Sequence, residues 1–155
     1  MRTSGEGAAP GKVILLGEHV VVHGRPAIAA TIDRQVRLSL TRRTDSRNVW
    51  SGLPASSDPD PRLDEALRLA IAGFAGEVPR SGLELNLGGN LPVSVGLGSS
   101  AALSVALLRA LAQLCGQTLS RDDLLQRSYD LERIFHGTPS GIDSTVVTVE
   151  GLVWF

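Results

Sequence analysis

Two glycines and two serines lie where a strand-like segment runs into a long apolar stretch. Gly96, Gly98, Ser99 and Ser100 belong to the sequence Leu-Pro-Val-Ser-Val-Gly-Leu-Gly-Ser-Ser-Ala-Ala at 91–102. The free amides and the positive dipole end of a helix start attract anions, and glycine lets a phosphate approach the backbone. The Ser100 hydroxyl could also ligate Mg²⁺ carried by a nucleotide. The segment therefore predicts a phosphate site, the alternative being a helix start at which Ser99 or Ser100 is only an N-cap.

Two carboxylates further along the chain have the chemistry that phosphoryl transfer requires. Glu132 and Asp143 flank a loop with the sequence Gly-Thr-Pro-Ser-Gly at 137–141. If both converge on the glycine–serine segment, one could hold a metal while the other faces a nucleophilic hydroxyl. Taken singly, each is more typical of a solvated or capping carboxylate.

A lysine near the N-terminus supplies a positive charge. Lys12 begins the apolar run 12–16, and Glu18 and His19 follow that run. An ammonium group there could neutralise phosphate charge or favour the ionised form of an adjacent aspartate. The alternative is a lysine at the edge of a strand. We expect His136, at the end of a helix, to be no more than a favourable cation there.

Two nucleotide-binding motifs compete for these glycines. The Gly-Lys pair at 11–12 does not form a Walker-type loop, because Glu6 replaces the first glycine and Val13 replaces the hydroxyl residue. The residues at 96–101 do match the dinucleotide fingerprint Gly-x-Gly-x-x-Ala. About 20 residues further on, however, Ser120 opens a helix, where the fingerprint requires an acidic residue at the end of a strand. A Rossmann domain is therefore only the runner-up.

The elements that must position these residues follow from hydrophobic periodicity and turn signals. Strands are expected at 12–16, 20–22, 27–32, 35–40, 83–87 and 151–155, and helices from Pro61 to about residue 74, at 99–115, and from Ser120 to near Gly137. The polar segment 41–61 is expected to hold at most one short strand, and 138–149 has no clear assignment. This order predicts an α+β fold rather than a regular βαβ alternation.

Composition limits the classes of function. The 155 residues are 43% apolar, enough for the core of one domain, and the net charge is −1. Nucleic acid and anionic membranes select strongly basic surfaces, so neither is expected as a partner. The single cysteine, Cys115, cannot form an internal disulfide, and residues 1–7 lack the apolar core of a secretion signal. We therefore expect a soluble cytoplasmic protein.

Three segments together resemble the GHMP kinase superfamily, named for galactokinase, homoserine kinase, mevalonate kinase and phosphomevalonate kinase. The run APGKVILLGEHVVVHGRPAIAATI at 9–32 is similar to the opening motif of its mevalonate kinase family. PVSVGLGSSAA at 92–102 is similar to the phosphate loop of the superfamily, and GTPSGIDS at 137–144 to the substrate-side loop of mevalonate kinases. The resemblance implies a mixed sheet with helices packed on one side, a fold shared with a ribosomal protein domain.

The resemblance also implies a role for each matched residue. It makes Asp143 the base for the substrate hydroxyl and Lys12 its electrostatic partner, both in contact with the substrate. It places Ser100 and Glu132 on Mg²⁺.

The same carry-over implies how the two substrates bind. Glu18 and His19 align with contacts to the acceptor, for which mevalonate is the leading candidate. The ATP phosphates are expected along Gly96, Leu97, Gly98, Ser99, Ser100 and Ala101. ATP and Mg²⁺ are thus the implied cofactors.

Superfamily members have a second domain whose glycine-rich motif closes the site. Residues 1–155 end in the apolar sequence Leu-Val-Trp-Phe at 152–155. We therefore expect the N-terminal domain of a longer kinase, the C-terminal domain being absent from this chain. The alternatives are another GHMP kinase, acting on phosphomevalonate or a sugar, and a non-catalytic fragment that binds a nucleotide or a partner. The oligomeric state stays open, a homodimer included.

Overall fold

A long antiparallel pair of strands forms one side of the sheet, which has five strands in the described part of the chain. In the computed structural model, β1 (Ser4–Leu16) pairs with β2 (Ile28–Arg42) along most of its length. The other edge of β2 pairs antiparallel with β4 (Leu83–Gly89) and, nearer its start, with β5 (Leu152–Trp154). The short β3 (Val49–Ser51) is parallel to β4, which makes the sheet mixed. The structure describes all residues except 1, 19–22, 54–59, 75–77, 79–80 and 94.

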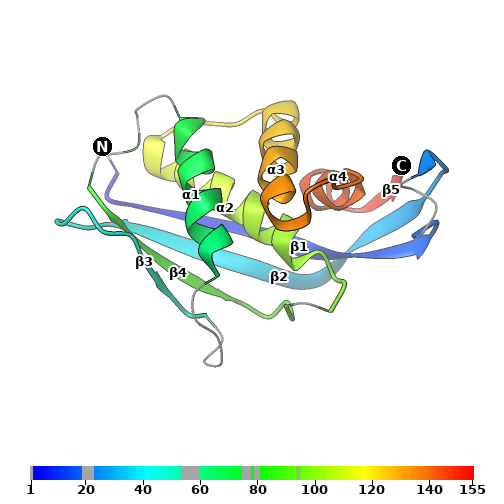
Figure 1. The fold of residues 1–155 in the computed structure, drawn as a ribbon, viewed down its shortest axis with the longest axis horizontal. Coiled ribbons are helices and arrows are strands. Elements are labelled where there is room, and N and C mark those ends of the chain that lie inside the picture. Colours follow the sequence, from blue (N-terminus) through cyan, green and yellow to red (C-terminus); the bar gives the residue numbers. More distant parts are fainter. Residues whose placement is uncertain (1, 19–22, 54–59, 75–77, 79–80, 94) are drawn as a thin grey trace.

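Four helices in the described residues cover one face of this sheet (Figure 1). They are α1 (Pro61–Ala72), α2 (Ser99–Cys115), α3 (Arg121–His136) and α4 (Ile142–Val149). The predicted α+β architecture, with helices on one side of a mixed sheet, is confirmed.

The helix starts predicted from the sequence have the expected caps. Asp60 accepts a hydrogen bond from the amide of Arg62, and Pro61 occupies the first turn of α1, where its missing N–H has no cost. The Ser120 hydroxyl accepts from the amide of Asp123 at the start of α3. Residue types at the helix boundaries therefore set where these helices begin.

Helix α2 is the centre of the core. It lies between the sheet and α3, and residues along almost all of its length are buried. On β2, Val36, Leu38 and Leu40 are buried below it while Arg37 is exposed, as the period-two pattern predicts. An element that is buried on most sides is rigid, so the N-terminus of α2 has a fixed position.

The sheet differs from the sequence prediction in two places, and a fourth helix is added. The strand expected at 12–16 begins at residue 4, and the two strands expected at 27–32 and 35–40 are one continuous β2. The unassigned segment 138–149 contains α4. The strand expected at 20–22 lies outside the described residues.

A second, smaller apolar cluster fixes α4 on the sheet. Ile142 and Val146 of α4 are buried against Ala27 and Ala29 at the start of β2. This contact places the first turn of α4 beside the second half of β1. None of the helices in the described part of the chain has the length and apolarity that a membrane crossing requires.

Candidate active site

Helix α2 begins in a loop that only glycine can form without strain. Gly96 and Gly98 have φ angles of +79° and +70°, in the left-handed region that disfavours residues with a side chain. Gly98 is the N-cap and offers no side-chain hydrogen bond, so neither Ser99 nor Ser100 caps the helix. Their hydroxyls are available for another role, and the amides of the first turn lack intrahelical acceptors.

Lys12 of β1 joins this loop to the sheet. Its amide donates to the carbonyl of Leu97 at 2.9 Å, and its Nζ donates to the carbonyl of Gly96 at 3.3 Å. A Cβ on Gly98 would lie 2.8 Å from Cγ of Lys12, so glycine is also needed for the lysine to pass. The side chain is almost fully buried, which rules out the alternative of a solvated lysine at a strand edge.

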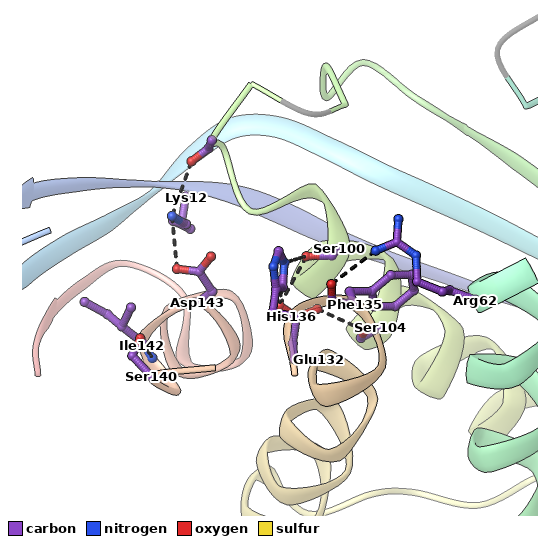
Figure 2. Close-up of polar contacts among 11 residues, drawn as sticks. Lys12, Arg62, Ser100, Ser104, Glu132, Phe135, His136, Ser140, Ile142 and Asp143 are labelled. Atoms are coloured by element: carbon purple, nitrogen blue, oxygen red, sulfur yellow. Dashed lines mark hydrogen bonds and ion pairs between the residues drawn. The ribbon is translucent and has the colours of Figure 1, made fainter. Parts of the chain in front are cut away.

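The ammonium group of Lys12 forms an ion pair with Asp143. Nζ lies 3.0 Å from Oδ1 of Asp143, which is in the first turn of α4 (Figure 2). Asp143 follows Ile142, whose burial fixes the start of this helix, and Gly141 at φ +88° allows the turn before it. The side chain of Asp143 remains 30% exposed, so a substrate can reach it.

A buried carboxylate lies behind Ser100. Oε2 of Glu132, on α3, accepts from the Ser100 hydroxyl at 3.1 Å, and Oε1 accepts from the Ser104 hydroxyl at 3.5 Å. Burial raises the pKa of Glu132 from 4.5 to about 7, and the nearby charge of Asp143 adds to this rise, while the two serine hydrogen bonds and the charge of Lys12 oppose it. Glu132 and Asp143, for which the sequence left convergence as a condition, both lie beside the glycine–serine segment.

Two adjoining cavities open onto these groups. A cavity of about 360 Å³ is lined by the loop and first turn of α2, including Gly96, Gly98, Ser99 and Ser100. A second, of about 280 Å³, is lined by Glu132 and the 139–144 segment. The residues common to both are Lys12, Glu18, His136 and Asp143. The Lys12–Asp143 pair therefore lies where the two cavities meet.

Four of the remaining candidate residues are placed as follows. Glu18 is exposed and lines both cavities. Leu97 contributes its carbonyl to Lys12, and Ala101 is fully buried, so only its backbone could meet a ligand. His19 lies outside the described residues.

The arrangement matches a known family. The model of the GHMP kinase N-terminal domain matches residues 64–151, which include the loop of α2, Glu132 and Asp143. The chain belongs to the GHMP kinase family.

Relatives of this GHMP kinase domain cover nearly all of its length. The mevalonate kinase of Pyrococcus horikoshii is 34% identical over 96% of the chain and 50% of the relative. Among solved structures, L. major mevalonate kinase in complex with R-mevalonate has a TM-score of 0.84 and 32% identity, covering 99% of this chain and 50% of that one. Mevalonate kinase of methicillin-resistant Staphylococcus aureus has a TM-score of 0.81 and 31% identity, with 99% and 53% covered. The chain thus spans about half the length of the curated relatives it matches.

The oxygen ligands of this GHMP kinase domain fit a cation that arrives with a nucleotide. The described residues contain no group of three or more His, Cys, Asp or Glu side chains able to hold a metal by themselves. Ser100 and Glu132 offer two oxygens, and Mg²⁺ is usually held by one or two protein ligands together with phosphates and waters. A cation there would also offset the cost of burying the Glu132 carboxylate.

The sequence does not predict two residues of the site. His136, expected only as a helix-end cation, has its Nε2 2.9 Å from the Ser100 hydroxyl oxygen. Arg62 lines the larger cavity, donates to the carbonyl of Phe135 at 3.1 Å and lies over its ring. The four-residue spacing from Glu132 places His136 on the same helix face and could have revealed it. Arg62 also pairs with Asp60, two residues before it, but that local contact does not reveal its place at the cavity, which depends on the packing of α1 against α3.

Proposed function

We propose that this chain is the N-terminal domain, residues 1–155, of an ATP- and Mg²⁺-dependent kinase that phosphorylates a small alcohol, with the 5-hydroxyl of mevalonate as the leading acceptor. The observation that carries the proposal is the 3.0 Å pair of Lys12 and Asp143, located between a cavity with a phosphate-type helix start and a second cavity. Transfer of a phosphoryl group to a hydroxyl needs a base that the acceptor can reach and that lies beside the phosphates of the donor.

In this proposal the ATP phosphates lie against the first-turn amides of α2 and the hydroxyls of Ser99 and Ser100. Asp143 accepts the proton of the acceptor hydroxyl as that oxygen forms its bond to the γ-phosphorus and the bond to the bridging oxygen of ADP breaks. Lys12 pairs with Asp143 at 3.0 Å and offsets negative charge on the transferring group. Mg²⁺ held by Ser100 and Glu132, when bound, neutralises charge on the β- and γ-phosphates.

The choice of mevalonate is supported by the relatives. Curated proteins and solved structures that match above 30% identity include mevalonate kinases, one of them in complex with R-mevalonate. In this chain the second cavity, with Glu18 and Asp143 on its wall, is the place for the acceptor. Phosphomevalonate and sugars stay as alternatives, because a change in substrate-side loops can switch the acceptor while the phosphate site is kept.

The second half of such a kinase would pack on an apolar surface at one end of the sheet. Leu152 and Trp154 of β5 are 71% and 73% exposed, and Leu16 of β1 is 65% exposed. Trp154 and Leu16 flank Ile28 of β2 on its two sides, so their side chains share one face of the sheet. Surfaces of this kind mark interfaces, and relatives twice as long would have the chain to cover it.

The interface is tested by the Trp154→Glu variant of the chain. We expect the chain to bind an apolar dye such as ANS at this surface and the variant to lose that binding. A discrete homodimer in analytical ultracentrifugation, lost in the variant, would instead assign the surface to a second copy.

The kinase proposal is tested by ADP release from ATP with Mg²⁺ and mevalonate, phosphomevalonate, galactose or homoserine in turn, with Asp143→Asn as the inactive control. Turnover with one acceptor that the variant lacks would support the proposal and name the substrate. Binding of Mg²⁺·ATP without turnover on any acceptor would assign the chain to non-catalytic nucleotide binding. Absence of nucleotide binding would overturn the phosphate site itself.

A further inference from the structure

The hydroxyl of Ser100 has two neighbours that compete for one proton. Its Oγ lies 3.1 Å from Oε2 of Glu132 and 2.9 Å from Nε2 of His136, and these two partner atoms are 3.7 Å apart (Figure 2). A serine hydroxyl has one proton to donate and two lone pairs that accept. Ser100 can therefore donate to the carboxylate or to the imidazole, but not to both.

A cation held by Ser100 and Glu132 would determine which of the two partners accepts the Ser100 proton. Each ligand oxygen must turn a lone pair to the cation, so the serine proton cannot stay between Oγ and Oε2. In the described part of the chain, the other hydrogen-bond partner found for this hydroxyl is Nε2 of His136. Only an imidazole with its proton on Nδ1 can accept there.

The backbone at His136 is positioned by helix α3 and by the contacts of Arg62 with the preceding residue. It is the last residue of α3, on the same helix face as Glu132, and its ring borders both cavities. The preceding residue, Phe135, is held by Arg62, which donates to its carbonyl and covers its ring. These contacts hold the backbone of the last turn of α3, from which the half-exposed side chain of His136 reaches Ser100 with its Nε2.

We propose that His136 is a positioning residue whose Nε2 accepts the Ser100 proton and so keeps a serine lone pair directed at the cation shared with Glu132. The role rests on the proposed nucleotide site, because a cation must be held there. It is the arrangement by which hydrogen-bond partners of metal ligands orient those ligands, and loss of such a partner typically weakens metal affinity 10- to 100-fold.

The first experiment compares ADP binding to the chain with Mg²⁺ and with EDTA, at pH 8, by calorimetry. In His136→Leu, which lacks an acceptor, we expect about 10- to 100-fold weaker binding of Mg²⁺·ADP and unchanged binding of metal-free ADP. His136→Gln, which brings an oxygen close to the position of Nε2, should restore the affinity to within about threefold of wild type. Arg133→Leu is the matched control, because Arg133 is exposed in the same helical turn and lines neither of these two cavities.

A second experiment uses the wild-type chain, so it does not depend on the folding of a variant. ¹⁵N NMR of the histidine-labelled chain, saturated with Mg²⁺·ADP, reports which ring nitrogen of His136 carries the proton. We expect an unprotonated Nε2 that accepts a hydrogen bond. A protonated Nε2 would reverse the direction of the bond and overturn the proposal.

The outcomes separate this proposal from the kinase proposal. A wild-type chain that binds no Mg²⁺·ADP would contradict the nucleotide site itself. A wild-type chain that binds it, together with a His136→Leu variant that binds equally well, would refute only the role of His136. Equal weakening with Mg²⁺ and with EDTA would show that His136 is merely structural.

Discussion

The ammonium nitrogen of Lys12 and the carboxylate of Asp143 are 3.0 Å apart, yet the lysine is 6% exposed and the aspartate 30%. The pair is therefore asymmetric. The cation is held inside the protein by the carbonyl of Gly96, in the loop before α2, whereas the carboxylate keeps an edge toward the cavities. A fixed positive charge beside an accessible base is an arrangement suited to proton removal.

Replacement of Lys12 by methionine keeps the length of the side chain and removes its charge. We expect turnover to fall by at least about 100-fold, because the positive charge that lies beside Asp143 and offsets negative charge on the transferring group is lost. Binding of ATP should weaken much less, since the first-turn amides of α2 remain. Steady-state kinetics and calorimetry on the same preparation separate the two effects, and a loss of turnover below about tenfold would contradict the role of Lys12.

Asp143→Asn and Ser100→Ala should differ in what they impair. The asparagine cannot take the hydroxyl proton, so turnover should fall by about 100-fold or more with nucleotide affinity little changed. The alanine removes a metal oxygen, so Mg²⁺·ATP should bind about 10-fold more weakly. Equal losses of affinity and turnover in both variants would disprove the assignment of roles.

The raised pKa of Glu132 makes folding depend on pH. Below pH 4.5 the carboxyl is protonated in both the folded and the unfolded chain. Between 4.5 and about 7, its folded-state pKa, the folded chain keeps a proton that the unfolded chain releases. The free energy of unfolding should therefore fall as pH rises through this window, by on the order of 3 kcal/mol in total.

Urea denaturation at pH 5, 6, 7 and 8 measures this contribution. Glu132→Gln, which has no proton to lose, should show a flatter dependence than wild type and greater stability at pH 8. Mg²⁺ binds the ionised carboxylate, so the affinity of wild type for Mg²⁺·ADP should rise over the same range. Parallel pH profiles for wild type and variant would mean that the burial of Glu132 does not govern them.

The sequence motifs predict which residues form the candidate site better than they predict the contacts that hold those residues in place. Lys12, Glu132 and Asp143 could be named because their motifs resemble those of GHMP kinases and because phosphoryl transfer needs a cation, a metal ligand and a base. The burial of Lys12 and the bond between Ser100 and His136 could not, since both depend on how α2, α3 and β1 pack. Local sequence carries no direct record of these long-range contacts.

The same limit explains the misplaced start of β1. Residues 4–11 are rich in glycine and alanine, which have low strand propensity, so the prediction begins the strand at Lys12. In the structure these small residues let α2 approach the strand closely. A Cβ on Gly5 or Gly7 would overlap the carbonyl oxygen of Ala110 or Ala106. Packing against a helix backbone, rather than intrinsic preference, makes this segment a strand.

Gly7→Ala should therefore destabilise the fold, and Gly88→Ala should not. The added methyl at Gly7 meets the backbone of α2, which cannot move without displacing the core, so we expect a loss of about 2 kcal/mol or more in the free energy of unfolding. Gly88, in β4, has open space within 4 Å of an added Cβ, and its change should stay within about 0.5 kcal/mol. Thermal and urea unfolding of both variants measure the difference. Similar stability of the two variants would indicate that the backbone of α2 does not lie as close to Gly7 as the structure shows. The packing of α2 on β1 would then no longer explain where Ser100 lies relative to Lys12.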